Sequence, residues 1–208
     1  MPEPAIKAIF TDVGGVLLTN GWGGDSRKRA AQQFQLDLAD MDARHHLTFD
    51  TYEIGKLSLD DYLDRIVFYQ PRNFSKDDYK SFVFAQSQSY PDMIELIRQT
   101  KIRNGLKLAV VSNEGRELTE YRIRKFGLAD FVDFFVSSCF VHYRKPDTDI
   151  FRMAIDMAQT PPDETIYLDD RPLFVEVARS MGLRAIHHTS YQDTCRAFSQ
   201  LGLVYSTP

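Results

Sequence analysis

Five short runs of apolar residues stand out along the chain and predict buried β-strands. They are Ala5–Phe10, Leu106–Val111, Phe134–Val136, Thr165–Leu168 and Arg184–Ile186. Segments with the hydrophobic spacing of helices separate the last four runs. Strands that alternate with helices along a chain are typical of a parallel sheet with helices on both faces. The pattern therefore predicts an α/β fold with a Rossmann-like parallel sheet core.

Two of the intervening helices are marked clearly. The segment Asp149–Ala158 has the spacing of an amphipathic helix, and its expected apolar face consists of Ile150, Met153, Ala154 and Met157. The segment Pro172–Met181 begins with proline and is followed by Gly182. Proline favours the first turn of a helix and glycine favours its end, so both boundaries are predicted.

The stretch between the first two runs is much longer than a single crossover needs. Its expected helices are Ser26–Phe34, Ser58–Phe68, Ser75–Gln86 and Pro91–Thr100. Ser58 with Asp61, and Ser75 with Asp78, have the spacing of capping boxes. We interpret residues 20–87 as a helical insertion and residues 1–19 with 88–208 as the core. The turn at residues 21–24 and the stretch at residues 87–91 would be its two hinges.

Composition narrows the class of protein. The chain is 43% hydrophobic, so it can bury a core, and its net charge of −4 argues weakly against a nucleic-acid surface, which normally needs a basic patch. It has no apolar run long enough for a membrane span, and its N-terminal stretch lacks the pattern of a secretory signal. Cys139 and Cys195 lie far apart and have no metal-binding spacing. We expect a soluble cytoplasmic protein with no nucleic-acid or membrane partner; its oligomeric state stays open.

Polar residues follow the ends of four predicted strands. In chain order they are Asp12 with Gly14 and Gly15, Ser112 with Asn113, Arg144 with Lys145, and Asp169 with Asp170. The carboxyl ends of parallel strands meet at one edge of the sheet, where ligands bind. Each site alone is an ordinary turn or helix cap. Their arrival in order, each directly after an apolar strand, indicates one shared crevice.

These residue types suit chemistry on a phosphate ester. A carboxylate such as Asp12 can attack phosphorus only where a divalent cation offsets the two negative charges. Magnesium prefers oxygen ligands, which Asp12, Asp170 and the carbonyl of Gly14 could supply. Lys145 and Ser112 would hold the non-bridging oxygens, where negative charge sits in the transition state.

The ordered set resembles the haloacid dehalogenase superfamily. IFTDVGGVLL, with Asp12, is similar to its first motif, and VVSN, with Ser112, to its second. YRKPDTDIF, with Lys145, resembles the third, and IYLDDRPLFVEVARSMGLRAI the fourth. The resemblance implies a nucleophilic Asp12, an aspartyl-phosphate intermediate, Mg²⁺ bound by Asp12, Gly14, Asp170 and Asp169, and a mobile helical cap at residues 20–87.

The cap segment YEIGKLSLDDYL resembles those of sugar-phosphate phosphatases, notably the α-glucose-1-phosphate phosphatase type. The expected substrate is a small phosphorylated metabolite. The residues proposed to bind it are Gly15, Asn113, Arg116, Arg171 and Glu53. His45 and His46 also lie in the cap and could face either the substrate or the solvent.

One departure keeps alternatives open. Phosphatases of the resembled family usually carry a second Asp two residues after the nucleophile, as general acid and base, and Gly14 occupies that position. A dehalogenase, which needs no metal, would use Asp12 to displace halide. A phosphonatase would need a cap lysine, for which Lys56 is available. A capped binding protein without turnover is the remaining alternative.

Overall fold

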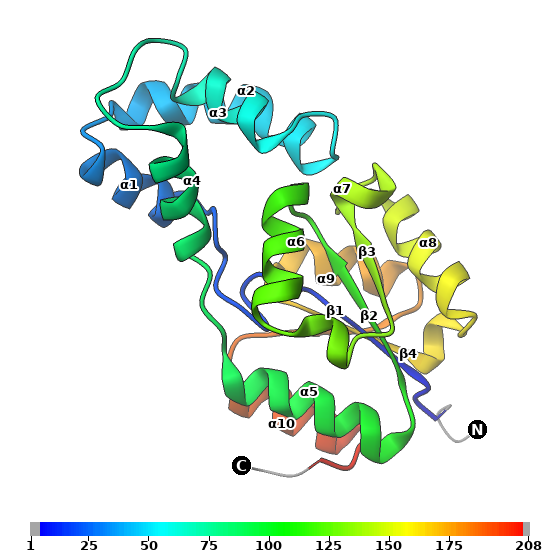
Figure 1. The fold of residues 1–208 in the computed structure, drawn as a ribbon. Helices are drawn as coiled ribbons and strands as arrows, with labels where there is room; N and C mark the ends of the chain where they lie inside the picture. Colours follow the sequence, from blue (N-terminus) through cyan, green and yellow to red (C-terminus); the bar gives the residue numbers. More distant parts are fainter. Residues whose placement is uncertain (1–4, 206–208) are drawn as a thin grey trace.

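A five-stranded parallel sheet forms the centre of the molecule, in the order β3-β2-β1-β4-β5 (Figure 1). The computed structural model describes residues 5–205, so the first residues of the N-terminal stretch discussed above lie outside it. The strands are β1 (Ala8–Thr11), β2 (Lys107–Ser112), β3 (Phe134–Ser137), β4 (Thr165–Asp169) and β5 (Arg184–His187). Each of the five predicted runs overlaps one of these strands, and the predicted α/β class is confirmed.

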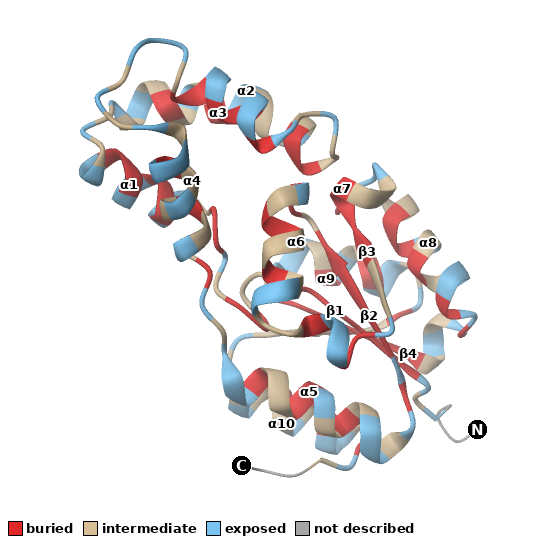
Figure 2. Ribbon diagram, in the orientation of Figure 1, coloured by how far each residue is buried: buried red, intermediate tan, exposed pale blue. Residues whose placement is uncertain are grey.

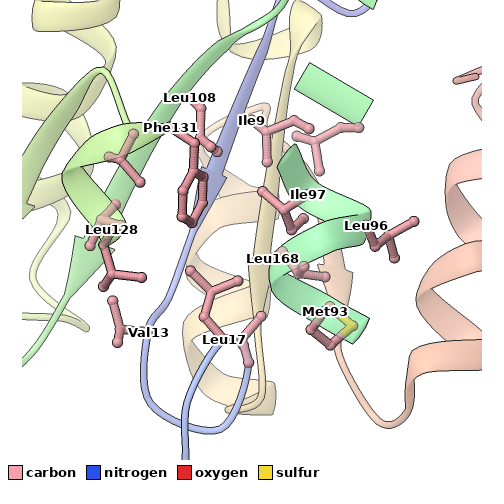
Figure 3. Packing of buried hydrophobic residues seen from close by; sticks show 14 of the residues in the cluster. Ile9, Val13, Leu17, Met93, Leu96, Ile97, Leu108, Leu128, Phe131 and Leu168 are labelled. Carbon is pink, nitrogen blue, oxygen red and sulfur yellow. The ribbon is translucent and has the colours of Figure 1, made fainter. Parts of the chain in front are cut away.

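Helices cover both faces of this sheet. They include α5 (Pro91–Asn104), α6 (Arg116–Lys125), α7 (Ser138–Val141), α8 (Thr148–Ala158), α9 (Pro172–Ser180) and α10 (Tyr191–Gln200), with two short 3-10 turns at Leu128–Asp130 and Pro162–Glu164. Alternate residues of a strand point to opposite faces. Ile9 accordingly packs with Leu96 and Ile97 of α5 (Figure 3), whereas Phe10 packs in the other cluster with Phe151 of α8. No helix within residues 5–205 has the length and apolar character to cross a bilayer.

Helix α8 shows one error in the predicted packing. Met157, placed on the buried face by its spacing, is 51% exposed, while Phe151 and Ala158 are buried beside Ile150 and Ala154. The Phe151 ring packs edge-on against Tyr167 of β4, with the ring centroids 5.1 Å apart. This contact is made by the neighbouring helical position, so the buried face is rotated away from Met157.

Four helices between β1 and β2 lie beyond the sheet, within residues 20–87, which we call the helical segment (Figure 1). They are α1 (Gly24–Gln33), α2 (Leu38–Glu53), α3 (Leu59–Ile66) and α4 (Lys76–Ala85). These helices bury side chains of their own (Figure 2), in an aromatic-rich cluster that includes Trp22, Tyr62 and Tyr79. The segment therefore has a hydrophobic core separate from the sheet.

The ends of these helices follow local sequence signals. Both predicted capping boxes are present, at the starts of α3 and α4. Helix α2 was not predicted. Its buried positions include His45 and Glu53 beside Met41 and Tyr52, so its buried face does not stand out as an apolar stripe.

Arg122 of α6 joins the helical segment to the core. Its side chain is 1% exposed and forms an ion pair with Glu114, Nη1 to Oε1, at 2.5 Å. Its Nη2 donates to the carbonyl of Thr19 at 3.0 Å, and its Nε donates to Ser87 Oγ at 3.0 Å. Thr19 and Ser87 lie on the two connections between the segment and the sheet. One buried guanidinium thus holds both connections.

Replacing Arg122 with methionine should lower the free energy of unfolding by about 3–5 kcal/mol, because Glu114 would remain buried without its cation. Urea unfolding followed by circular dichroism measures the change. Adding Glu114→Gln to that variant should recover part of the loss.

The matched control is Arg124→Met on the same helix, where the side chain is 73% exposed. It should leave the stability almost unchanged. Equal effects of the two arginine substitutions would contradict the role assigned to Arg122.

Candidate functional site

Three carboxylates meet at the carboxyl edge of the sheet. Asp12 follows β1, Asp169 ends β4 and Asp170 comes directly after it. The register pairs Thr11 of β1 with Leu168 of β4, so the residues that follow are neighbours. One oxygen of each carboxylate lies within 4.8 Å of an oxygen of the others. The geometry thus brings together three of the acids that the sequence placed at one crevice.

The ammonium group of Lys145 lies between two of these acids. Its Nζ is 2.6 Å from Asp169 Oδ2 and 3.3 Å from Asp12 Oδ2, and the lysine side chain is fully buried. Burial alone lowers the pKa of the Lys145 amine, but attraction to the two carboxylates outweighs it and holds that pKa above its ordinary value. Lys145 therefore carries a positive charge inside the protein.

Asn113 positions Lys145 through the backbone. Its side-chain carbonyl accepts from the backbone N–H of Lys145 at 2.8 Å, and its amide donates to the carbonyl of the same residue at 2.8 Å. The sequence proposed Asn113 as a substrate-binding residue. It does border the cavity described below, but both of its polar atoms are used in holding the lysine loop.

Asp12 has the accessibility and charge that a nucleophile needs. It is 8% exposed, its Oδ1 accepts from the backbone N–H of Val13 at 2.7 Å, and its Oδ2 faces Lys145. Burial raises the pKa of Asp12 to about 6; Lys145 opposes this rise and Asp169 adds to it. At neutral pH the carboxylate is therefore mostly ionised, although it is close to its titration range.

The acidic group fits a hard divalent cation. Asp169 is already engaged by Lys145, by the hydroxyl of Tyr167 and by the backbone N–H of Arg171. Asp170 Oδ1, in contrast, is buried and accepts no hydrogen bond from the described residues. A buried carboxylate oxygen without a donor, close to two other carboxylates, is a suitable oxygen ligand for Mg²⁺. The bound ion would have Asp12 and Asp170 as its available carboxylates.

Gly15 is required beside this group. It has a positive φ of 75°, and a Cβ there would lie 2.2 Å from Asp170 Oδ2. A side chain at this position would displace the Asp170 carboxylate. The sequence proposed Gly15 as a substrate contact. In the structure, Gly15 and Asp170 both line a second pocket, separate from the cavity over Asp12.

A cavity of about 390 Å³ opens over Asp12 and is lined from both parts of the chain. From the core it is lined by Asp12, Gly14, Ser112, Asn113, Glu114, Gly115, Leu118, Arg122, Arg144, Arg171 and Phe174. From the helical segment it is lined by Asn20, Trp22, Gly23, Gly24, Arg27, His45, Phe49, Tyr52 and Glu53. Any ligand that reaches Asp12 in this cavity is therefore also close to helices α1 and α2.

Glu53 reaches this cavity from α2 and pairs with Arg144, which the sequence placed at a strand end beside Lys145 without giving it a role. Arg144, directly before Lys145, places its Nη2 2.7 Å from Glu53 Oε2 and also binds Asp50. Burial raises the pKa of Glu53 to about 7, while Arg144 opposes the rise. In the sequence, Arg144 is marked only by the adjacent Lys145. Its partner Glu53 lies about ninety residues earlier, so no local pattern predicts this ion pair.

Other predicted residues have different surroundings. Arg116 is absent from the cavity walls; it donates to the carbonyl of Cys139 at 2.9 Å and lies over the Phe140 ring. The first turn of α6 thus directs Arg116 toward α7, and its contact with substrate stays a prediction. Arg171 does line the cavity, with a side chain that is 61% exposed. His45 lines it too, but its Nδ1 is 2.7 Å from the Tyr62 hydroxyl.

Comparison with known proteins identifies related sequences. A model of the haloacid dehalogenase-like hydrolase family matches residues 6–182. PpaX of Caldanaerobacter subterraneus subsp. tengcongensis, whose name assigns it provisionally to the pyrophosphatases, is 28% identical over 149 residues, covering 65% of this chain and 66% of its own. Flavin mononucleotide hydrolase 1 of Arabidopsis thaliana is 24% identical over 174 residues, covering 81% and 67%. The chain spans about two thirds of the length of both relatives.

Solved structures share the fold over nearly the whole chain. A HAD family enzyme of Bacteroides thetaiotaomicron superposes with a TM-score of 0.77 at 19% identity, covering 94% of this chain and 99% of its own. A structure of the same enzyme with magnesium and inorganic phosphate has a TM-score of 0.75 at 20% identity, covering 93% and 100%. The arrangement of sheet and helices is therefore that of known HAD structures.

The two adjacent acids should differ in their effect on stability. Asp169→Ala should lower the free energy of unfolding by about 3–5 kcal/mol, because it removes the closest counter-charge of buried Lys145. Asp170→Ala should change stability little, because its carboxylate has only a 3.4 Å contact with Asn20 Nδ2 and a 3.8 Å ion pair with the exposed Arg171 side chain. Chemical unfolding in metal-free buffer measures both, and a larger loss for Asp170→Ala would contradict this assignment.

Proposed function

The chain belongs to the haloacid dehalogenase-like hydrolases, and we propose that it is a magnesium-dependent phosphatase with Asp12 as its nucleophile. The observation that carries the proposal is the position of Asp12: at the floor of a cavity, 3.3 Å from a buried lysine and beside Asp170. A carboxylate held between a cation and an oxygen-rich metal site suits attack on a phosphate better than on an uncharged carbon.

The proposed reaction has two displacement steps. An oxygen of Asp12 attacks phosphorus, the bond from phosphorus to the ester oxygen breaks, and the departing oxygen keeps the electron pair. Water then attacks the aspartyl-phosphate, releasing inorganic phosphate and restoring the carboxylate. Lys145 and Ser112 would stabilise charge on the non-bridging oxygens. Asp12, Asp170 and the carbonyl of Gly14 would hold magnesium, and Asp169 would complete the acidic group around it. The ion would offset the negative charges of the nucleophile and the phosphate.

The helical segment would act as a cap that selects the substrate. Its helices line the same cavity as Asp12, and the volume of about 390 Å³ suits a small metabolite. The similarity of YEIGKLSLDDYL to caps of the α-glucose-1-phosphate phosphatase type supports a sugar phosphate as one candidate. Arg171 and Glu53, both on the cavity wall, are proposed contacts of that substrate.

The alternatives have less support from the site. A dehalogenase has no need of a metal, so the buried Asp170 oxygen that accepts no hydrogen bond from the described residues would have no use in its reaction. A phosphonatase would need its cap lysine inside the cavity, whereas Lys56 is exposed and is absent from the cavity walls. The phosphatase proposal uses both Asp12 and Asp170.

Turnover of p-nitrophenyl phosphate should require magnesium. Activity should vanish in a chelator and return when magnesium is added, because Asp12 and the phosphate repel each other without it. Asp12→Asn should lower turnover by at least about a thousandfold, since the amide cannot attack. Release of inorganic phosphate measures both effects.

Asp170→Ala serves as the matched variant, because it should keep its stability yet lose magnesium-dependent turnover. Full activity in chelator would favour the dehalogenase alternative. Absence of turnover from the unaltered protein, on this ester and on a library of phosphorylated metabolites, would favour a binding protein.

The rate should depend steeply on the leaving group, because Gly14 provides no acid to protonate the departing oxygen. Protonation by a general acid is worth roughly a hundredfold to ten-thousandfold. Aryl and anomeric sugar phosphates should therefore react faster than phosphates of simple primary alcohols. The measurement is log rate against leaving-group pKa for a series of esters.

The control for this series is Gly14→Asp, which should flatten the slope. A Cβ at Gly14 would lie 3.1 Å from Asn20 Oδ1, so the new side chain needs only a small shift of that amide. A flat slope in the unaltered protein would mean that another acid donates the proton, and Glu53, with its raised pKa, would be the first to test.

A further inference from the structure

Arg27 of α1 is a buried cation with unused hydrogen-bond donors. Its side chain is 10% exposed and lines the cavity that contains Asp12. Its Nε donates to Asp42 Oδ1 at 2.6 Å. Its two terminal nitrogens form no hydrogen bond with any residue in the range 5–205. A guanidinium has five N–H donors, so four remain available at the cavity wall.

The neighbouring polar groups do not use these donors. Trp22 Nε1 donates to the Tyr62 hydroxyl at 2.9 Å, and that hydroxyl lies 2.7 Å from His45 Nδ1. Burial lowers the pKa of His45 to about 3, so its ring is uncharged at neutral pH. These three side chains therefore satisfy one another and leave Arg27 as the charged group of this part of the wall.

Two other arginines of the cavity, half-buried Arg144 and buried Arg122, are already engaged. Arg144 pairs with Asp50 and Glu53, and Arg122 binds Glu114 and both connections of the helical segment. Arg27 differs because Asp42 takes only its Nε. Because Arg27 lines the cavity, a ligand there could accept from its terminal nitrogens without breaking the Asp42 ion pair.

We propose that Arg27 forms a subsite for a second anionic group of the substrate, at the end away from the phosphate that Asp12 attacks. The planar pair of terminal nitrogens matches the two oxygens of a carboxylate or a phosphate. The substrate class is then a small phosphate monoester that carries a further oxyanion. This inference rests on the proposed phosphatase function and specifies its substrate.

The test uses three phosphate esters built on one alcohol scaffold that differ only at the end far from the ester oxygen, in a carboxylate, a second phosphate or an uncharged carboxamide. The unaltered protein should show a kcat/KM roughly 10- to 100-fold higher for at least one of the anionic esters than for the carboxamide, as expected for charge-assisted hydrogen bonds. The preferred ester tells which oxyanion the subsite takes.

Arg27→Met should abolish this preference, and Arg27→Lys, which keeps the charge without the planar pair, should retain only part of it. The matched control is Lys28→Met on the same helix, where the side chain is 63% exposed; it should keep the preference. Equal kcat/KM for all three esters in the unaltered protein, or an unchanged preference in Arg27→Lys and Arg27→Met, would overturn the proposal.

Calorimetric binding of the same esters to Asp12→Asn separates this inference from the proposed function. Tighter binding of an anionic ester, lost in Asp12→Asn with Arg27→Met, would support the subsite even if the unaltered protein turned over none of the esters. Equal binding of the charged and uncharged esters would overturn the subsite, whether or not phosphatase activity is found.

Discussion

The buried charge of Lys145 is the constraint on which the site depends. An ammonium group with no exposed surface needs counter-charges within the protein, and Asp169 at 2.6 Å and Asp12 at 3.3 Å supply them. The ends of β1 and β4 and the loop between α7 and α8 must therefore converge on one point. The parallel register of β1 with β4 makes this possible by placing the two acids side by side.

The need to neutralise Lys145 gives the adjacent carboxylates of Asp169 and Asp170 different roles. Asp169 is committed to Lys145, Tyr167 and the backbone, which keeps the lysine in place. Asp170, one residue later, is left with a buried oxygen that has no donor among the described residues. The two adjacent acids thus have different environments: Asp169 is suited to positioning the Lys145 ammonium group, and Asp170 is suited to binding a metal.

The helical segment adds polar groups to a cavity that the sheet alone would leave open. An aromatic core holds its helices together, and Arg122 attaches both of its connections to α6. This arrangement buries Arg27, His45 and Glu53 against the cavity. All three have partners in the protein, and all three line the cavity that also contains Asp12, which places them within reach of a ligand there.

The sequence by itself determined the five strands, the two capping boxes and the acids at the strand ends, because apolar runs and caps are local properties of the chain. Tertiary structure decided which helical positions face inward: Phe151 and not Met157, and the mixed face of α2 that carries Glu53. It also decided that Arg144 reaches Glu53 while Arg116 turns away. Such contacts join residues distant in the sequence, and they depend on how whole helices rotate and pack, which no local pattern encodes.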